Sequence, residues 1–163
     1  MTRRMLVATI ACILGPVLKA QQKQYSGPWP AKKGVPYLAH GDKLIETEAV
    51  QASQSNSKEG MVFSVPGATS PARTPLAEPI FLFATERFRA EQLGLYRFEV
   101  KNGARQVALS SKRRKADAGK QYHLTIRKLD DGLYRLEASE TLDPGEYALS
   151  PEGDNTAFCF TVF

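Results

Sequence analysis

Short apolar runs that alternate with polar residues are the feature that most constrains the fold of this chain. After residue 34, no window of helical length holds apolar residues at the 3.6-residue spacing of an amphipathic helix. Gly, Pro, Asn and Asp residues separate the runs, as they separate strands in an antiparallel sheet. One segment, Thr85–Leu93, has room for a short turn of helix. The pattern therefore predicts an all-β fold, an antiparallel Ig-like or Greek-key β-sandwich of about seven to ten strands.

The dipeptide Asn102-Gly103 predicts a first hairpin. Asn-Gly is the preferred two-residue type I′ turn, because both residues tolerate a positive φ. Counting outward from this turn gives the pairs Lys101–Ala104, Phe98–Val107 and Tyr96–Leu109. Apolar side chains then face apolar side chains, as a half-buried sheet requires.

A second hairpin is predicted around Asp130-Asp131-Gly132. A two-residue turn at Asp131-Gly132 would place Ile126 opposite Glu137, which mixes apolar and charged residues on one face. A three-residue turn with Gly132 in the left-handed conformation avoids this mismatch. It gives the pairs Leu129–Leu133, Lys128–Tyr134, Ile126–Leu136 and Leu124–Ala138. The face pattern therefore favours the three-residue turn.

The same register places Arg127 opposite Arg135 on the outward face. Like charges in opposite positions destabilise a sheet by a few tenths of a kcal/mol to about 1 kcal/mol. Two explanations follow: Glu137 and a neighbouring strand neutralise the arginines, or this face binds an anion. Arg127 and Arg135 are therefore candidate anion-binding residues.

The C-terminal part contains a corner and a last strand. Pro144 and Gly145 predict the corner, and Tyr147 follows it closely. The sequence is compatible with a tyrosine corner, in which the hydroxyl bonds to upstream backbone, and with a plain core residue at the start of a strand. The alternating run Thr156–Phe163 predicts the last strand.

The N-terminus has the order of a secretory signal peptide. Arg3 and Arg4 precede an apolar stretch that ends at Ala20, where the composition turns polar. We expect cleavage after Ala20 and a periplasmic or secreted protein; a twin-arginine signal and a lipoprotein signal at Cys12 are the weaker alternatives. The predicted organisation is a signal peptide at 1–20, an extended arm at 21–34 and one β-sandwich domain at 35–163. Within the domain, Gln51–Gly60 and Gly67–Pro79 are predicted loops, being polar and proline-rich respectively.

Net charge bears on the class of partner, and cysteine content bears on how the domain is stabilised. The net charge of +5 falls by three, to +2, when the signal peptide removes Arg3, Arg4 and Lys19 and no acid. A nucleic acid partner is therefore not expected. Cys159 is the one cysteine of the processed chain, so the domain must be stable without an internal disulfide.

A basic run follows the predicted strand that ends near Ser110. It consists of Lys112, Arg113, Arg114 and Lys115. Four adjacent cations suit an acidic polymer, and they equally suit a solvated loop that keeps the protein soluble. These four residues, like Arg127 and Arg135, are therefore candidate anion-binding residues. The expected partner is an acidic polysaccharide or an envelope protein.

The residues that usually carry catalysis are sparse. His40 lies in a predicted turn, His123 is predicted to point outward, and Cys159 is predicted to be a buried, inert thiol. No spacing of His and Cys suits zinc, no Gly-x-Ser-x-Gly motif is present, and no glycine-rich loop suits phosphate. We therefore expect no cofactor, no metal and no catalytic residue. The alternative is a small secreted hydrolase whose site is assembled across loops.

Three groups of segments together carry a resemblance. Gly34–Tyr37 with Gly41–Leu44, Leu129–Leu136 with Leu142–Leu149, and Phe158–Phe160 are similar to small exported bacterial proteins of uncharacterised function. The resemblance implies an exported β-sandwich and no transferable catalytic residue. The expected function is a non-enzymatic binding or interaction module of the bacterial cell envelope.

Overall fold

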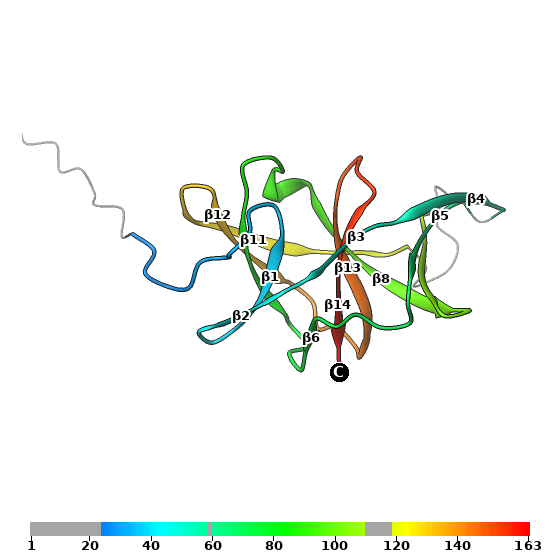
Figure 1. The fold of residues 1–163 in the computed structure, drawn as a ribbon, viewed down its shortest axis with the longest axis horizontal. Coiled ribbons are helices and arrows are strands. Elements are labelled where there is room, and N and C mark those ends of the chain that lie inside the picture. The colour runs from blue at the N-terminus through cyan, green and yellow to red at the C-terminus, as the bar shows by residue number, and fades with distance from the viewer. Residues whose placement is uncertain (1–23, 59, 110–118) are drawn as a thin grey trace, which may run out of the picture.

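The computed structural model describes residues 24–58, 60–109 and 119–163. Over these ranges the chain forms fourteen strands and one 3-10 turn, Ala90–Gln92, and no α-helix. Two sheets pack against each other, which confirms the predicted all-β sandwich (Figure 1). The strands outnumber the predicted seven to ten, partly because two of them have two residues each. The predicted Ig-like connectivity stays a prediction.

The smaller sheet has five strands in the order β11-β12-β7-β1-β2. The strands are β11 (Leu124–Asp130), β12 (Leu133–Ala138), β7 (Ile80–Ala84), β1 (Pro36–His40) and β2 (Lys43–Glu46). All its pairings are antiparallel. In Figure 1 it lies on the side of the molecule from which the N-terminal arm extends.

The second hairpin confirms most of the predicted register and corrects its turn. Its ladder contains the pairs Leu124–Ala138, Ile126–Leu136, Arg127–Arg135 and Lys128–Tyr134. The predicted pair Leu129–Leu133 is wrong, because Leu133 faces Asp130 across a two-residue turn. The extra residue is absorbed by an irregularity between Lys128 and Asp130, so a bulge restores the face pattern that a longer turn was expected to provide.

The larger sheet follows the order β3-β14-β13-β8-β9-β5-β4. The strands are β3 (Glu48–Gln51), β14 (Thr156–Val162), β13 (Gly145–Pro151), β8 (Leu93–Lys101), β9 (Ala104–Leu109), β5 (Gly60–Pro66) and β4 (Ser53–Ser57). Two short strands flank this path: β6 (Arg73–Thr74) runs parallel to β14, and β10 (Gln121–Tyr122) pairs with β8. The predicted last strand is thus confirmed as β14.

The first hairpin has the predicted turn but separates sooner than expected. Lys101 pairs with Ala104, and Asn102 and Gly103 have the positive φ values of 52° and 74° that a type I′ turn needs. The described ladder ends at the pair Glu99–Gln106, one step before the predicted pair Phe98–Val107. The predicted pair Tyr96–Leu109 is wrong: Tyr96 pairs with Gln121 of β10, and Leu109 pairs with Met61 of β5. Strand β9 pairs with β5 along its whole length but with β8 only near the turn, so β8 and β9 diverge and the larger sheet bends.

The bend brings the ends of the larger sheet together. Strands β3 and β4 stand at opposite ends of the strand order, yet Ala52 alone separates them in the chain. The segment Glu48–Ser57 thus pairs first with β14 and then with β5. The prediction of a loop at Gln51–Gly60 is therefore wrong, since the polar side chains of β4 are exposed while its backbone pairs with β5.

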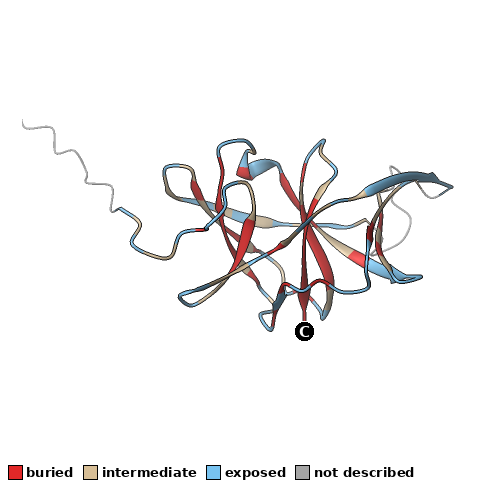
Figure 2. Ribbon diagram, viewed as in Figure 1, coloured by how far each residue is buried: buried red, intermediate tan, exposed pale blue. Residues whose placement is uncertain are grey.

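Two hydrophobic clusters result, one on each face of the larger sheet. The first fills the space between the sheets and contains Phe81, Phe83, Tyr147, Leu149 and Phe160 among others. The second lies inside the bend and is formed by Val65, Phe98, Val107, Ala148, Ala157 and Cys159. Figure 2 shows the central strands buried and β4 exposed.

The described part of the arm, residues 24–34, forms no regular structure but contacts the smaller sheet. The Tyr25 N–H donates to the Asp130 carboxylate at 3.2 Å, and the Gly34 N–H donates to the Ala84 carbonyl at 2.7 Å. Trp29 is 48% exposed, with its ring edge against Tyr25. No helix in the described part of the chain is long and apolar enough to cross a membrane.

Candidate functional site

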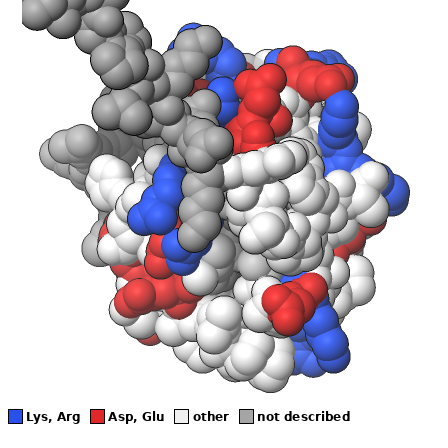
Figure 3. All heavy atoms as spheres, turned by 90° about the vertical axis from the view of Figure 1, so that its left-hand side faces the viewer, with Lys and Arg blue, Asp and Glu red and all other residues white. Residues whose placement is uncertain are grey.

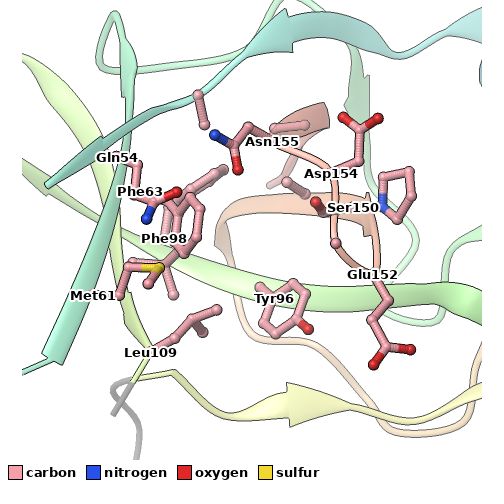
Figure 4. Close-up of a pocket in the computed structure, with 16 residues that line it drawn as sticks. Gln54, Met61, Phe63, Tyr96, Phe98, Leu109, Ser150, Glu152, Asp154 and Asn155 are labelled. Carbon is pink, nitrogen blue, oxygen red and sulfur yellow. The ribbon is translucent and has the colours of Figure 1, made fainter.

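A pocket of about 370 Å³ opens inside the bend of the larger sheet (Figure 4). This volume is within the range of small-ligand sites in proteins. The apolar side chains that line it include Met61, Phe63, Tyr96, Phe98, Val107 and Leu109. They come from β5, β8 and β9, the strands whose departure from a flat sheet creates the bend.

The pocket exists because the two faces of β13 and β14 differ in side-chain size. Tyr147 and Phe158 point into the cluster between the sheets, whereas the neighbouring residues Ala148 and Ala157 line the pocket. Ala52, at the junction of β3 and β4, is a third small lining residue. Small side chains on the floor leave space that the larger wall residues do not fill.

One side of the mouth is polar and acidic. It is formed by Ser150, Glu152, Asp154 and Asn155 at the turn from β13 to β14, with Gln54 of β4 nearby. The turn is fixed by Asp154, whose Oδ1 accepts hydrogen bonds from the Thr156 N–H at 2.7 Å and the Thr156 hydroxyl at 2.6 Å. These bonds, the side-chain bond first, lower the pKa of Asp154. No Lys, Arg or His is among the described residues that line the pocket.

Tyr96 lies at the mouth between the apolar wall and Glu152. Burial raises the pKa of its hydroxyl, and the negative charge of Glu152 adds to the effect. The ring lies over Gly94, where an added Cβ would come within 2.6 Å of its Cε2 atom. The absence of a side chain at Gly94 therefore allows the position of Tyr96.

The other end of the bend is closed by a buried ion cluster. The Arg105 side chain of β9 is 1% exposed and donates to both Glu48 carboxylate oxygens, at 2.7 and 3.1 Å. It also donates to the carbonyls of Pro66 and Gly67 at 3.0 Å each. Glu146 lies 4.0 Å away from the guanidinium. Arg105 thus links β9 to β3, strands that are not neighbours in the sheet.

The second carboxylate of this cluster has its own donors. Glu146 accepts from the Ser70 N–H at 3.0 Å and from the Thr161 hydroxyl at 2.8 Å. Cys159 is buried, as predicted, and lies near this cluster. Burial raises the pKa of its thiol to about 12. A protonated, buried thiol is a poor nucleophile.

Sequence reasoning missed both the pocket and the ion cluster. A signal for the cluster was present, because Arg105 stands at an inward position of the alternation that Val107 and Leu109 continue. No comparable signal marked the pocket, whose lining residues come from segments far apart in the sequence.

No protein-family model, no curated protein and no solved structure matches this chain.

The structure describes two of the predicted anion-binding residues, Arg127 and Arg135. The run Lys112, Arg113, Arg114 and Lys115 lies outside the described residues. Arg127 and Arg135 are opposite each other, and the Arg135 Nη2 atom lies 3.0 Å from the Glu137 carboxylate. Glu137 thus offsets one charge of the pair, whereas the neighbouring strand β7 places the uncharged Leu82 opposite Arg135. Figure 3 shows charges of both signs interleaved around the end of the molecule that bears the arm.

At the corner after Pro144 and Gly145, the Tyr147 hydroxyl donates to the Asp143 carbonyl at 2.8 Å. The Tyr147 ring is buried and stacks on Phe160, with centroids 5.7 Å apart. The two interpretations of Tyr147 are therefore compatible, because one side chain packs in the core and bonds to upstream backbone. Burial raises its pKa to about 12.

Neither histidine lies in the pocket. The His40 ring Nε2 is 2.8 Å from the Thr74 hydroxyl, and His40 is half-buried at the end of β1 rather than in the predicted turn. His123 is exposed, as predicted. No group of three potential metal ligands occurs in the part of the chain that the structure describes.

Proposed function

We propose that this protein is an exported, non-enzymatic binding module of the bacterial cell envelope, and that it binds an apolar group in the pocket of the larger sheet. The observation that carries the proposal is the pocket itself, with its apolar walls, small floor residues and polar mouth. Ligand sites in proteins typically combine an apolar cavity with a few polar groups that orient the ligand.

The alternative, a small secreted hydrolase, has less support. Ser150 lines the pocket, but its hydroxyl donates to the Thr156 carbonyl at 2.9 Å. The described lining has no histidine to act as a base for this serine. Turnover of p-nitrophenyl esters that is lost on Ser150→Ala would favour the hydrolase.

Binding of an uncharged fluorescent probe, N-phenyl-1-naphthylamine, tests the proposed site. We expect saturable binding to the full chain and its loss in Ala148→Leu, because the larger side chain fills the floor of the pocket. Ala68→Leu is the control, since this residue is exposed and does not line the pocket. Equal binding by all three proteins would contradict the site.

Export is tested separately, by mass spectrometry of the protein recovered from the periplasm or medium of a bacterial host. The order of charged, apolar and small residues at 1–20 leads us to expect a chain that begins at Gln21. A recovered chain that begins at Met1, or an entirely cytoplasmic protein, would contradict export.

A further inference from the structure

Strand β4 differs from the other strands at the ends of the two sheets. The other three carry charges: Arg127 and Lys128 on β11, Lys43 and Glu46 on β2, and Glu48 on β3. The sequence of β4, residues 53–57, is Ser-Gln-Ser-Asn-Ser, with neither a charge nor a proline, and all five residues are exposed. Charges, prolines and bulges are the usual means by which proteins prevent an edge strand from pairing with another chain. β4 has no such charge or proline.

The free side of β4 carries backbone groups available for pairing. Among the described residues, β4 pairs with β5 alone. Ser57 pairs with Gly60 across a two-residue turn, and the residues beside such a turn form a hydrogen-bonded pair. Because hydrogen-bonded pairs recur at every second residue, the N–H and C=O groups of Ser53 and Ser55 also point toward β5. The N–H and C=O groups of Gln54 and Asn56 therefore point away from β5.

This free side borders the pocket. The Ala52 N–H donates to the Asn155 carbonyl at 2.8 Å, which holds the chain to the turn before β14. Beyond Ala52 the chain pairs with β5, and Gln54 and Asn155 both line the pocket at its mouth. An added strand along β4 would thus lie beside the opening.

We propose that an extended segment of a partner polypeptide adds to β4 as a strand and places apolar side chains in the pocket. The inference rests on the proposed function and names its ligand class. In this mode of recognition, main-chain hydrogen bonds give affinity and pockets for alternate side chains give specificity. Residues two apart in the added strand share a face, so two such side chains reach the pocket together.

The mouth defines the charge of the partner segment. Glu152 is exposed, has no ion-pair partner among the described residues, and lies beside the opening with Asp154. Because no described cation lines the pocket, a Lys or Arg beside the apolar residues of the segment complements the mouth.

A second copy of this chain fits the site less well. Pairing of β4 with β4 of another copy would satisfy the strand edge, but the side chains of Ser-Gln-Ser-Asn-Ser offer nothing apolar to the pocket. A small apolar ligand would fill the pocket but would leave the edge of β4 unpaired.

The test is selection of a displayed library of random linear peptides on the full chain. We expect enriched peptides with apolar residues at alternate positions and a neighbouring Lys or Arg. Their affinity should fall at least about tenfold in Asn56→Pro, which removes an outward N–H group. Asn56→Ala is the matched control, because it keeps that N–H group and should keep the affinity.

Hydrogen exchange gives a second readout that a general loss of folding would not reproduce. On peptide binding, the amides of Gln54 and Asn56 should gain protection, whereas those of Ser53 and Ser55 already bond to β5. Peptides that bind Asn56→Pro as well as the parent, or no enriched peptide at all, would overturn the inference. So would a dimer of the parent chain that Asn56→Pro dissociates.

The naphthylamine probe separates this inference from the proposed function. Asn56→Pro should bind the probe normally, because the pocket remains open, whereas Ala148→Leu should bind neither probe nor peptide. Probe binding without peptide binding overturns strand addition alone. Failure of the parent chain to bind the probe contradicts the proposed function.

Discussion

Arg105 is the residue whose truncation should cost the fold most. Its guanidinium is buried and bonded to Glu48, with Glu146 nearby, so Arg105→Ala leaves carboxylates in a buried site without their cation. Removal of one partner from a buried ion pair typically destabilises a protein by about 3–5 kcal/mol. We expect a loss of this size in the free energy of unfolding measured with urea. Arg127→Ala, on an exposed strand position, should change it by less than about 0.5 kcal/mol.

Glu48 should make stability depend on pH in the acid range. Burial acts to raise its pKa, but the hydrogen bonds from Arg105 and the positive charge outweigh burial, and the pKa is lowered. A carboxyl group with a lowered folded-state pKa contributes stability above its unfolded pKa, near 4.3, and this stability is lost as the pH falls through the lower folded value. The free energy of unfolding of Glu48→Gln should therefore change less with pH below about 4 than that of the parent. Identical pH profiles would contradict this role.

At the level of elements, the arginine pair of the second hairpin allows a test in which the sign of the stability change is predicted. Arg127→Glu places opposite charges across from each other and should stabilise the protein by about 0.2–1 kcal/mol. Thr125→Glu is the control with the opposite sign, because Thr125 faces Glu137. The measurement is urea unfolding at low salt and again at about 1 M salt, where screening should remove both effects. A gain that persists at high salt would show that the charges are not its cause.

In the same hairpin, the alternation of apolar residues predicts the strand register but not the length of the turn. The face pattern predicted the pairs from Leu124 to Lys128, because a slip by one residue would expose the apolar set. It could not distinguish a longer turn from a shorter turn with a bulge at Leu129, since both restore the same faces.

Elements stabilised by their neighbours were harder to predict than hairpins. Strand β4 has no apolar residue, so its pairing depends on β5 and left no pattern in its own sequence. The predicted pair Tyr96–Leu109 is wrong for a related reason: β9 pairs with β8 only near the turn, and β10 pairs with β8 at Tyr96 instead. Local rules predict a hairpin near its turn and do not predict where its strands separate.

At the scale of the whole molecule, the two faces of the larger sheet differ in how they are packed. The face with Tyr147 and Phe158 packs on the smaller sheet, and the face with Ala148 and Ala157 surrounds a hollow. At the other end of the bend, the Arg105–Glu48 ion pair links β9 to β3. Alternating large and small residues in β13 and β14 thus give a packed core on one face and a pocket on the other.

At the same scale, the sequence concentrates positive charge in one segment, and we predict that any affinity for acidic polymers depends on it. Arg135 pairs with Glu137, and Arg97 lies 3.7 Å from Asp143 and bonds to the Pro144 carbonyl, so these arginines are partly offset. The run at 112–115 has four cations and no acid. We therefore expect retention on a dextran sulfate column to fall when these four residues are replaced by Ser, and to remain when Arg127 and Arg135 are replaced instead.

The salt dependence of this retention distinguishes direct contact from a general effect of net charge. Each cation that neutralises an acidic group on a densely charged polymer releases condensed counterions, so affinity falls linearly with the logarithm of salt concentration. Replacement of the run should flatten this slope, whereas the double arginine variant should keep the slope of the parent. An equal decrease for the run and for the arginine pair would mean that net charge, rather than the run, governs the affinity. Retention of the parent slope after replacement of the run would assign these cations to solubility alone.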